Sequence, residues 1–137
     1  MIRGKHFLCA EFVIRDAESN GISLINLLEQ AVPQGFPALL PRLAVLLLLE
    51  RDPGDPNEIT YTFKVRMDED PPLFEQSVTS GFQGQLSTRQ IMIVGGLPIP
   101  HPGKLRLTAA TPTQTLGDYV IPIQPPNQPT VSINATT

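Results

Sequence analysis

Proline and glycine divide this chain into short segments and leave little room for a long helix. The 137 residues include 15 prolines and 10 glycines, but no tryptophan. Proline lacks the backbone N–H that a helix interior needs, and both residue types favour turns and the ends of strands. The sequence therefore predicts a fold made of short strands joined by turns.

Length and composition indicate one globular domain. A chain of 137 residues has the usual size of a single domain and can bury roughly two-thirds of the surface that it exposes when unfolded. Hydrophobic residues make up 41% and charged residues 17%, which differs from the composition of disordered chains. We expect a sandwich domain over residues 1–124 and a Pro- and Thr-rich tail over residues 125–137.

Alternation of apolar and polar residues predicts the strands. It is clearest in Glu58–Met67, where Tyr61, Phe63 and Val65 point inward and the residues between them face water. The predicted fold is an all-β, antiparallel β-sandwich, immunoglobulin-like or C2-like, of seven or eight strands, with at most one short helical turn. The strands are expected at residues 5–14, 22–28, 43–49, 58–67, 73–78, 85–94, 104–109 and 119–123.

Turn residues indicate how these strands connect. The stretch Asp52–Pro56 predicts a turn that joins the third and fourth strands as a hairpin. Gly95 and Gly96 are expected to end the sixth strand, and the turn at Leu116–Asp118 to join the last two strands. The proline-rich segment Glu29–Pro41 is expected to be a packed loop that caps one end of the core.

The segment Leu43–Leu49 is apolar on both faces, which predicts a central strand that is covered on both sides. A two-layer sandwich covers only one face of each sheet, so Ala44, Leu46 and Leu48 require another cover. Three candidates are open: the Glu29–Pro41 loop, which we favour, the tail, or a second protein molecule. If nothing covers Ala44, Leu46 and Leu48, they form an interaction patch.

Charge and cysteine content narrow the possible partners and compartments. A net charge of −3 disfavours nucleic acid and anionic membranes, both of which attract basic surfaces. Glu11 and Arg15 interrupt the first apolar stretch, so no export signal is expected, and no stretch is long enough to predict a membrane span. The lone Cys9 cannot form an internal disulfide, which favours the cytoplasm.

No catalytic pattern is apparent, and we expect a protein that is not an enzyme and binds no cofactor. The two histidines, His6 and His101, lack a flanking nucleophile motif, and His101 lies among prolines in a loop. His6 and Cys9 are three residues apart on a strand and therefore point to opposite faces. Cys9 is interpreted as a small apolar core residue.

Acidic turns suggest a second kind of site. If successive strands run alternately up and down, the turns that carry Asp16 and Asp52 to Glu58 lie at the same end of the sandwich. Calcium binds six to eight oxygens, so Asp16, Asp52 and Asp55 are candidate ligands. The simpler interpretation is that these acids cap backbone amides and stay hydrated.

The stretch Leu116–Tyr119 resembles the glycine-containing start of a late sandwich strand, in which a Tyr hydroxyl fixes a neighbouring loop. We therefore interpret Tyr119 as a structural residue.

The order of several motifs resembles a family of small bacterial proteins of unknown function. The similarity extends over residues 6–124, and it implies a bacterial or phage origin and a single sandwich domain. It carries over no catalytic residue. The matching motifs are Phe7–Asp16 with its cysteine, Ser19–Asn26, Gly35–Pro37, Leu43–Leu47 and Gly117–Tyr119.

These observations favour a non-enzymatic interaction or scaffold module. It would act on a protein partner, or form a homo-oligomer, through a sheet face, an edge strand or the tail. The alternative is a ligand-binding sandwich that uses the acidic loops for calcium-assisted binding of a carbohydrate or a lipid headgroup.

Overall fold

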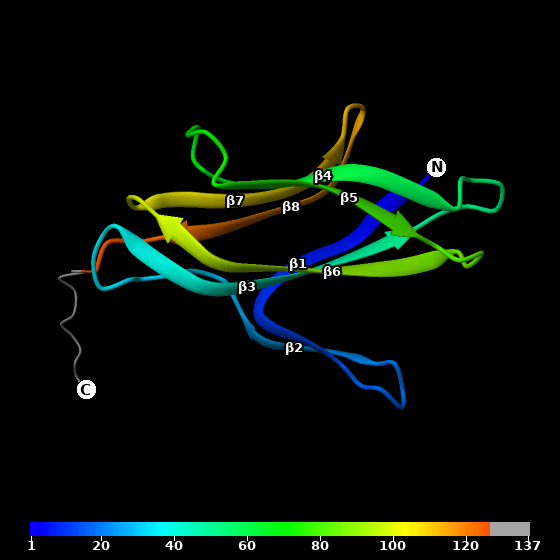
Figure 1. The fold of residues 1–137 in the computed structure, drawn as a ribbon, viewed down its shortest axis with the longest axis horizontal. Helices are drawn as coiled ribbons and strands as arrows, with labels where there is room; N and C mark the ends of the chain where they lie inside the picture. The colour runs from blue at the N-terminus through cyan, green and yellow to red at the C-terminus, as the bar shows by residue number, and fades with distance from the viewer. Residues whose placement is uncertain (127–137) are drawn as a thin grey trace.

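Eight β-strands make up the regular structure of residues 1–126 (Figure 1). The structure is a computed structural model that describes residues 1–126, so most of the predicted tail lies outside the described residues. The part of the chain that it describes has no helix long and apolar enough to span a membrane. The strands are β1 (Arg3–Arg15), β2 (Ile22–Leu27), β3 (Ala38–Glu50), β4 (Glu58–Met67), β5 (Phe74–Gly81), β6 (Ser87–Ile99), β7 (Gly103–Thr111) and β8 (Gln114–Ile123).

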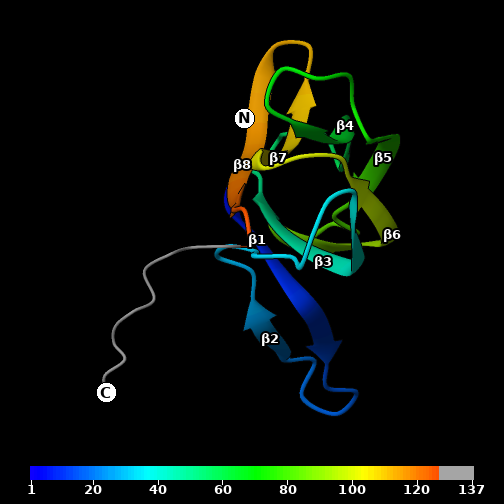
Figure 2. The same ribbon diagram turned by 90° about the vertical axis from the view of Figure 1, so that its left-hand side faces the viewer.

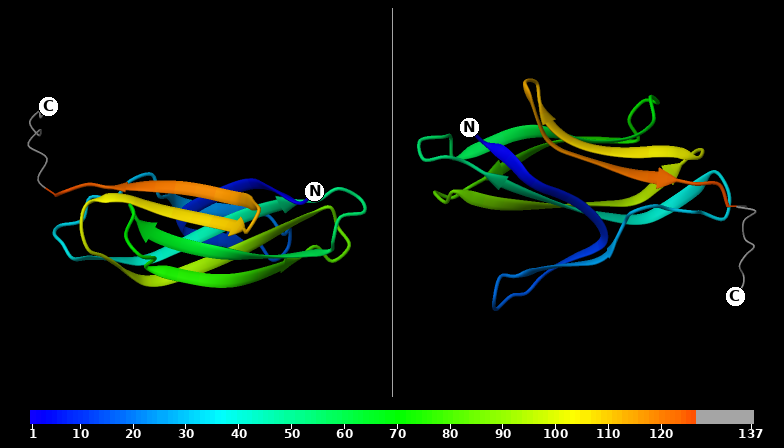
Figure 3. Two further views of the ribbon diagram at one scale, coloured as in Figure 1. Left: turned by 90° about the horizontal axis from the view of Figure 1, so that it is seen from above. Right: turned by 180° about the vertical axis from the view of Figure 1, so that it is seen from behind.

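The strands form two four-stranded sheets that pack face to face. Sheet A has the order β2-β1-β3-β6, and sheet B has the order β5-β4-β7-β8. Every ladder in both sheets is antiparallel. Figure 1 shows sheet B above sheet A, and Figure 3 shows the same two layers from above and from behind. The predicted all-β, antiparallel sandwich is therefore confirmed.

The core lies between the sheets and contains alternate residues of each strand. In β4, the side chains of Tyr61, Phe63, Val65 and Met67 are buried, as the alternation predicted. The ring of Phe63 lies edge-on to the rings of Phe7 and Phe74, with centroids 6.5 Å and 5.9 Å away. These three rings join β1 of sheet A to β4 and β5 of sheet B, so they hold the two layers together.

Strand β3 is central, as predicted, but it does not form a hairpin with β4. It pairs with β1 on one side and with β6 on the other, so neither of its edges is free. The turn at Asp52–Pro56 instead carries the chain from sheet A to sheet B. The hairpin prediction is wrong because a tight turn can join strands of two different layers as well as neighbours in one sheet.

Strands β3 and β6 extend beyond their predicted ends at Pro41 and at Gly95–Gly96. Leu40 pairs with Leu97 and Arg42 pairs with Gly95, so the ladder continues on both sides of Pro41. Gly96, at the matching position of β6, has a φ of 65°, a conformation that glycine adopts easily. The proline and this glycine form one local irregularity inside the ladder, where the sequence predicted its end.

The last two strands pair as predicted, but the predicted turn between them is wrong. Strand β7 ends at Thr111 and β8 begins at Gln114, whereas Leu116 and Gly117 lie inside β8 and are buried. A Cβ atom on Gly117 would lie 2.4 Å from Cγ of Phe7. Gly117 therefore makes room for the side chain of Phe7 and does not form a turn.

The two sheets meet closely along one side, where β1 runs beside β8. A Cβ atom on Gly4 would lie only 1.7 Å from the backbone oxygen of Leu116. The side-chain Nε2 of Gln114 donates a hydrogen bond to the carbonyl of Ile2 at 2.7 Å. We call this contact between β1 and β8 the seam.

Candidate interaction surface

The second half of β1 leaves the sandwich and forms a two-stranded ribbon with β2. Strand β1 pairs with β3 only from Arg3 to Ala10, and beyond this point it pairs with β2 alone. We call residues 11–27 the arm. Figures 1 and 2 show the arm on the side of sheet A that faces away from sheet B, which we call the outer face of sheet A. The arm is thus a partial third layer.

Two arginines of sheet A hold the arm in place. Arg42 of β3 donates from Nε to the carbonyl of Glu11 at 3.1 Å, and its guanidinium lies 4.9 Å from the ring centroid of Phe12. Arg89 of β6 donates a hydrogen bond to the carbonyl of Asn20 at the tip of the arm. No carboxylate within residues 1–126 forms an ion pair with Arg42 or Arg89. Both guanidinium groups instead bind backbone oxygens of the arm.

The base of the arm is fixed by Tyr119. Its hydroxyl donates to the carbonyl of Leu28 at 2.6 Å, and the N–H of Leu28 donates to the carbonyl of Cys9 at 2.9 Å. The prediction that a Tyr hydroxyl of this strand fixes a neighbouring segment is confirmed. Tyr119 belongs to sheet B, so this bond joins Leu28, the residue that follows the arm, to the opposite layer.

Replacing Tyr119 with phenylalanine should lower the free energy of unfolding by about 1 kcal/mol, because the carbonyl of Leu28 loses its hydroxyl donor. Urea unfolding followed by circular dichroism measures this change. The variant should also show faster amide exchange at Leu28 than the wild type. Unchanged stability together with unchanged exchange would contradict the role given to this hydroxyl.

The arm exposes large apolar side chains on one face. The register pairs Phe12 with Ile25, Ala10 with Leu27 and Ile14 with Ser23, so Phe12, Ile14, Ile25 and Leu27 share a face. Their exposed fractions are 40%, 49%, 39% and 44%. They are four of the nine large apolar side chains that are exposed within residues 1–126. An isolated two-stranded ribbon is only marginally stable in water, and a group of exposed apolar side chains is typical of interaction surfaces.

The predicted interaction residues lie on the outer face of sheet A, next to the arm. Ala44 is fully buried, Leu46 is 5% exposed, and Leu48 is partly buried. The chain itself therefore covers most of this strip. The Glu29–Pro41 segment, the cover that the sequence favoured, packs instead against the core between the sheets, through residues such as Ala31 and Phe36. The largest group of exposed apolar side chains lies on the arm, and Ile93 of β6, which pairs with Ala44, is also 55% exposed.

A groove lies between the tip of the arm and the turn that joins β5 to β6. Its volume is about 400 Å³, and Asn20, Phe82 and Arg89 contribute to its lining. Leu48 also reaches this groove. The arm therefore leaves one end of the outer face of sheet A open.

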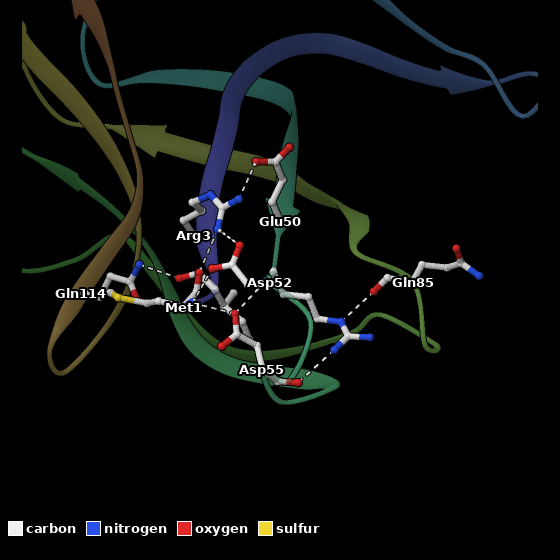
Figure 4. A network of polar contacts seen from close by, with 9 residues as sticks. Met1, Arg3, Glu50, Asp52, Asp55, Gln85 and Gln114 are labelled. Carbon is white, nitrogen blue, oxygen red and sulfur yellow. Dashed lines mark hydrogen bonds and ion pairs between the residues drawn. The ribbon is translucent and has the colours of Figure 1, made fainter.

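Two of the three calcium candidates lie together, but the third does not join them. The amino group of Met1 lies 2.9 Å from Oδ2 of Asp52 and 2.7 Å from Oδ2 of Asp55 (Figure 4). Its hydrogen bonds hold the pKa of both carboxyls below the ordinary value. The carboxylate of Asp16 accepts a hydrogen bond from the hydroxyl of Ser19 at 2.7 Å, and this bond lowers the pKa of Asp16. Residues 1–126 contain no group of three or more His, Cys, Asp or Glu side chains that could hold a metal ion.

The side chain of His101 is partly exposed and has polar partners, whereas Cys9 lies in the core. His101 contacts Asp70 through Nε2 at 2.6 Å and the carbonyl of Pro102 through Nδ1 at 2.7 Å. Both contacts raise the pKa of His101, the contact with Pro102 more strongly. Cys9 is fully buried, and burial raises the pKa of its thiol to about 12. A thiol in this environment is a poor nucleophile, because the thiolate is the reactive form.

Comparison of the sequence with protein families and curated proteins gave no match. The role of the arm is therefore argued from the chemistry and geometry of this chain alone.

Proposed function

We propose that this protein is a non-enzymatic interaction module that binds a protein partner through its arm. The observation that carries the proposal is the row of half-exposed apolar side chains on one face of the ribbon: Phe12, Ile14, Ile25 and Leu27. Full burial of one such side chain contributes about 1.5–3 kcal/mol, so covering all four would stabilise a complex by several kcal/mol.

The outer face of sheet B provides a contrast within the same molecule. There Thr60 and Thr79 bond to each other through their hydroxyls at 2.7 Å, and Arg106 pairs with Asp118 at 2.9 Å. Such polar side chains are well solvated and need no cover. None of the nine large apolar side chains that are exposed within residues 1–126 belongs to a strand of sheet B, whereas four of them lie on the arm.

The arm also offers backbone groups to a partner. Strand β2 is the terminal strand of sheet A and has β1 as its neighbour on one side only. A terminal strand presents unpaired N–H and C=O groups, and an extended segment of a partner can pair with them. Apolar side chains and backbone hydrogen bonds would then act together at one surface.

The proposal includes the compartment and excludes catalysis. We place the protein in the cytoplasm, where a reducing environment suits a single buried thiol at Cys9. Binding through an apolar strand requires neither a nucleophile nor a cofactor, and no step of the proposed function uses one.

An affinity experiment with a matched pair of variants tests the proposal. Ile25→Lys places a charge on the arm, whereas Leu39→Lys places the same charge on an exposed apolar position of β3 outside the arm. Tagged wild type, Ile25→Lys and Leu39→Lys serve as baits in extracts of cells that express the protein naturally. The wild type and Leu39→Lys should retain the same partner, and Ile25→Lys should lose at least nine-tenths of it.

Circular dichroism first establishes that both variants are folded. A partner that all three baits retain equally would place the binding surface elsewhere and overturn the proposal. The absence of any retained protein, including further copies of the chain itself, would also count against it.

A further inference from the structure

We infer that the arm binds a second copy of this chain, by antiparallel pairing of the two β2 strands about a two-fold axis. This inference rests on the proposed function and names the partner of the same surface. The pairing would join the two A sheets into one continuous sheet, with the two arms at its centre.

The terminal strand β2 lacks the features that normally keep sheet edges apart. Charged residues and prolines on an edge strand disfavour pairing with another chain. Residues Ile22–Leu27 read Ile-Ser-Leu-Ile-Asn-Leu and contain neither a charge nor a proline. Each of the other three edge strands carries at least one such residue: Glu75 in β5, Arg89 and Pro98 in β6, and Asp118 and Pro122 in β8.

The same sequence makes β2 complementary to itself. In a two-fold arrangement each residue meets a residue of the identical strand, so a charged strand would bring like charges close together. No residue of β2 carries a charge, so two antiparallel copies of this strand have no charge repulsion between them in any register. An uncharged strand also gives a different protein little to recognise specifically, and this favours a second copy as the partner.

The pairing strand itself contributes apolar area to a homodimer. If a large side chain has a total area of about 200 Å², the exposed fractions of Ile25 and Leu27 on β2 amount to roughly 170 Å² per copy. Two copies then offer about 330 Å², against about 1,000 Å² of apolar area in a standard homodimer interface. Apolar side chains thus supply at most about a third of that apolar area, and backbone hydrogen bonds between the two β2 strands are the main contact.

Pairing would also stabilise the ribbon itself. A sheet of three or more strands is markedly more stable than a two-stranded ribbon. In a single chain, β1 after Ala10 pairs only with β2, and β2 pairs only with β1. Two arms paired through β2 would form a four-stranded sheet. The same step thus pairs the free edge and places the apolar side chains of the two β2 strands side by side.

Light scattering coupled to size-exclusion chromatography, over a wide range of protein concentrations, tests the inference. The wild type should show twice the mass of one chain at high concentration. Ser23→Lys adds a charge at an exposed position of β2 and should raise the dimer dissociation constant at least tenfold. Ser77→Lys makes the same change at an exposed position of the edge strand β5 and should leave the dimer unchanged.

Hydrogen exchange of the wild type gives a second readout that needs no variant. Amides of β2 should become more protected as the concentration rises, whereas amides of β5 should not change. A wild type that stays monomeric at every concentration would overturn the inference, and so would a dimer that Ser23→Lys leaves intact.

These outcomes separate the inference from the proposed function. If the protein is monomeric but an arm-dependent partner of another kind is retained, the second-copy inference fails and the proposed function stands. If the protein is monomeric and no partner depends on the arm, both fail.

Discussion

Replacing Gly4 with alanine is expected to lower the free energy of unfolding by about 3 kcal/mol or more, the upper range for overpacking. The new Cβ would lie 1.7 Å from the carbonyl oxygen of Leu116 and 2.7 Å from its carbonyl carbon. Both are backbone atoms of β8, so no side chain can rotate away to make room. Strands β1 and β8 must move apart, which opens the seam between the two sheets.

Guanidinium unfolding at equilibrium measures this effect, and Gly81→Ala is the matched control. Gly81 also lies in a strand, but a Cβ there has no neighbour within 4 Å and the residue has no positive φ. That variant should differ from the wild type by roughly 0.5 kcal/mol or less, or be slightly stabilised. If Gly4→Ala were as stable as Gly81→Ala, the close approach at the seam would be refuted.

Replacing Phe63 with alanine should lower the free energy of unfolding by about 3–5 kcal/mol. Its side chain is 1% exposed and contacts the rings of Phe7 and Phe74, so its removal leaves a cavity between the two sheets. A domain of this size has a total stability of about 5–15 kcal/mol, so the melting temperature should fall by roughly 10–20 °C.

Calorimetry measures the melting temperature, and two further variants calibrate the result. Phe63→Leu keeps much of the volume and should cost less than half as much as Phe63→Ala. Leu39→Ala removes an apolar side chain that is 64% exposed and should change the stability by about 0.5 kcal/mol or less. Equal effects of Phe63→Ala and Leu39→Ala would show that Phe63 does not occupy the core.

The sequence alone predicted the elements whose signals are local. In Glu58–Met67 the alternation of apolar and polar residues predicts which side chains are buried, and the buried side chains of β4 are the predicted ones. The two apolar faces of Leu43–Leu49 likewise predicted a central strand, and β3 has neighbours on both sides. In both cases the prediction concerns which side chains are buried, and the hydrophobicity of a side chain indicates this directly.

Features that depend on contacts distant in sequence could not be predicted in the same way. The turn at Asp52–Pro56 would form a hairpin only if β4 paired with β3. Strands β1 and β6 occupy both edges of β3, and the turn residues give no information about this. The glycine at 117 reads as a turn residue, but its role becomes clear only when Phe7 is placed against it.

The arm was missed for the same reason. Residues 5–14 alternate as one strand, and nothing in that pattern signals that β1 loses β3 as its neighbour after Ala10. Ala44, Leu46 and Leu48 lie on the second apolar face of β3, but the exposed apolar side chains near them belong to β1, β2 and β6. The unprotected edge of β2, by contrast, can be predicted from the sequence, because Ile22–Leu27 contains no charged residue and no proline.

The continuity of β1 also has a mechanical consequence. One strand runs from the seam, past β3 and into the arm, so a force applied to the arm in the direction of the first half of β1 loads that half along its own axis. Hydrogen bonds of an antiparallel ladder lie across the strand direction. The ladder between β1 and β3 therefore resists such a pull in shear, with its bonds sharing the force. Strand β2, which is attached to β1 alone, can instead be peeled away one pair at a time. Under tension the arm would yield first, and the sandwich would stay intact.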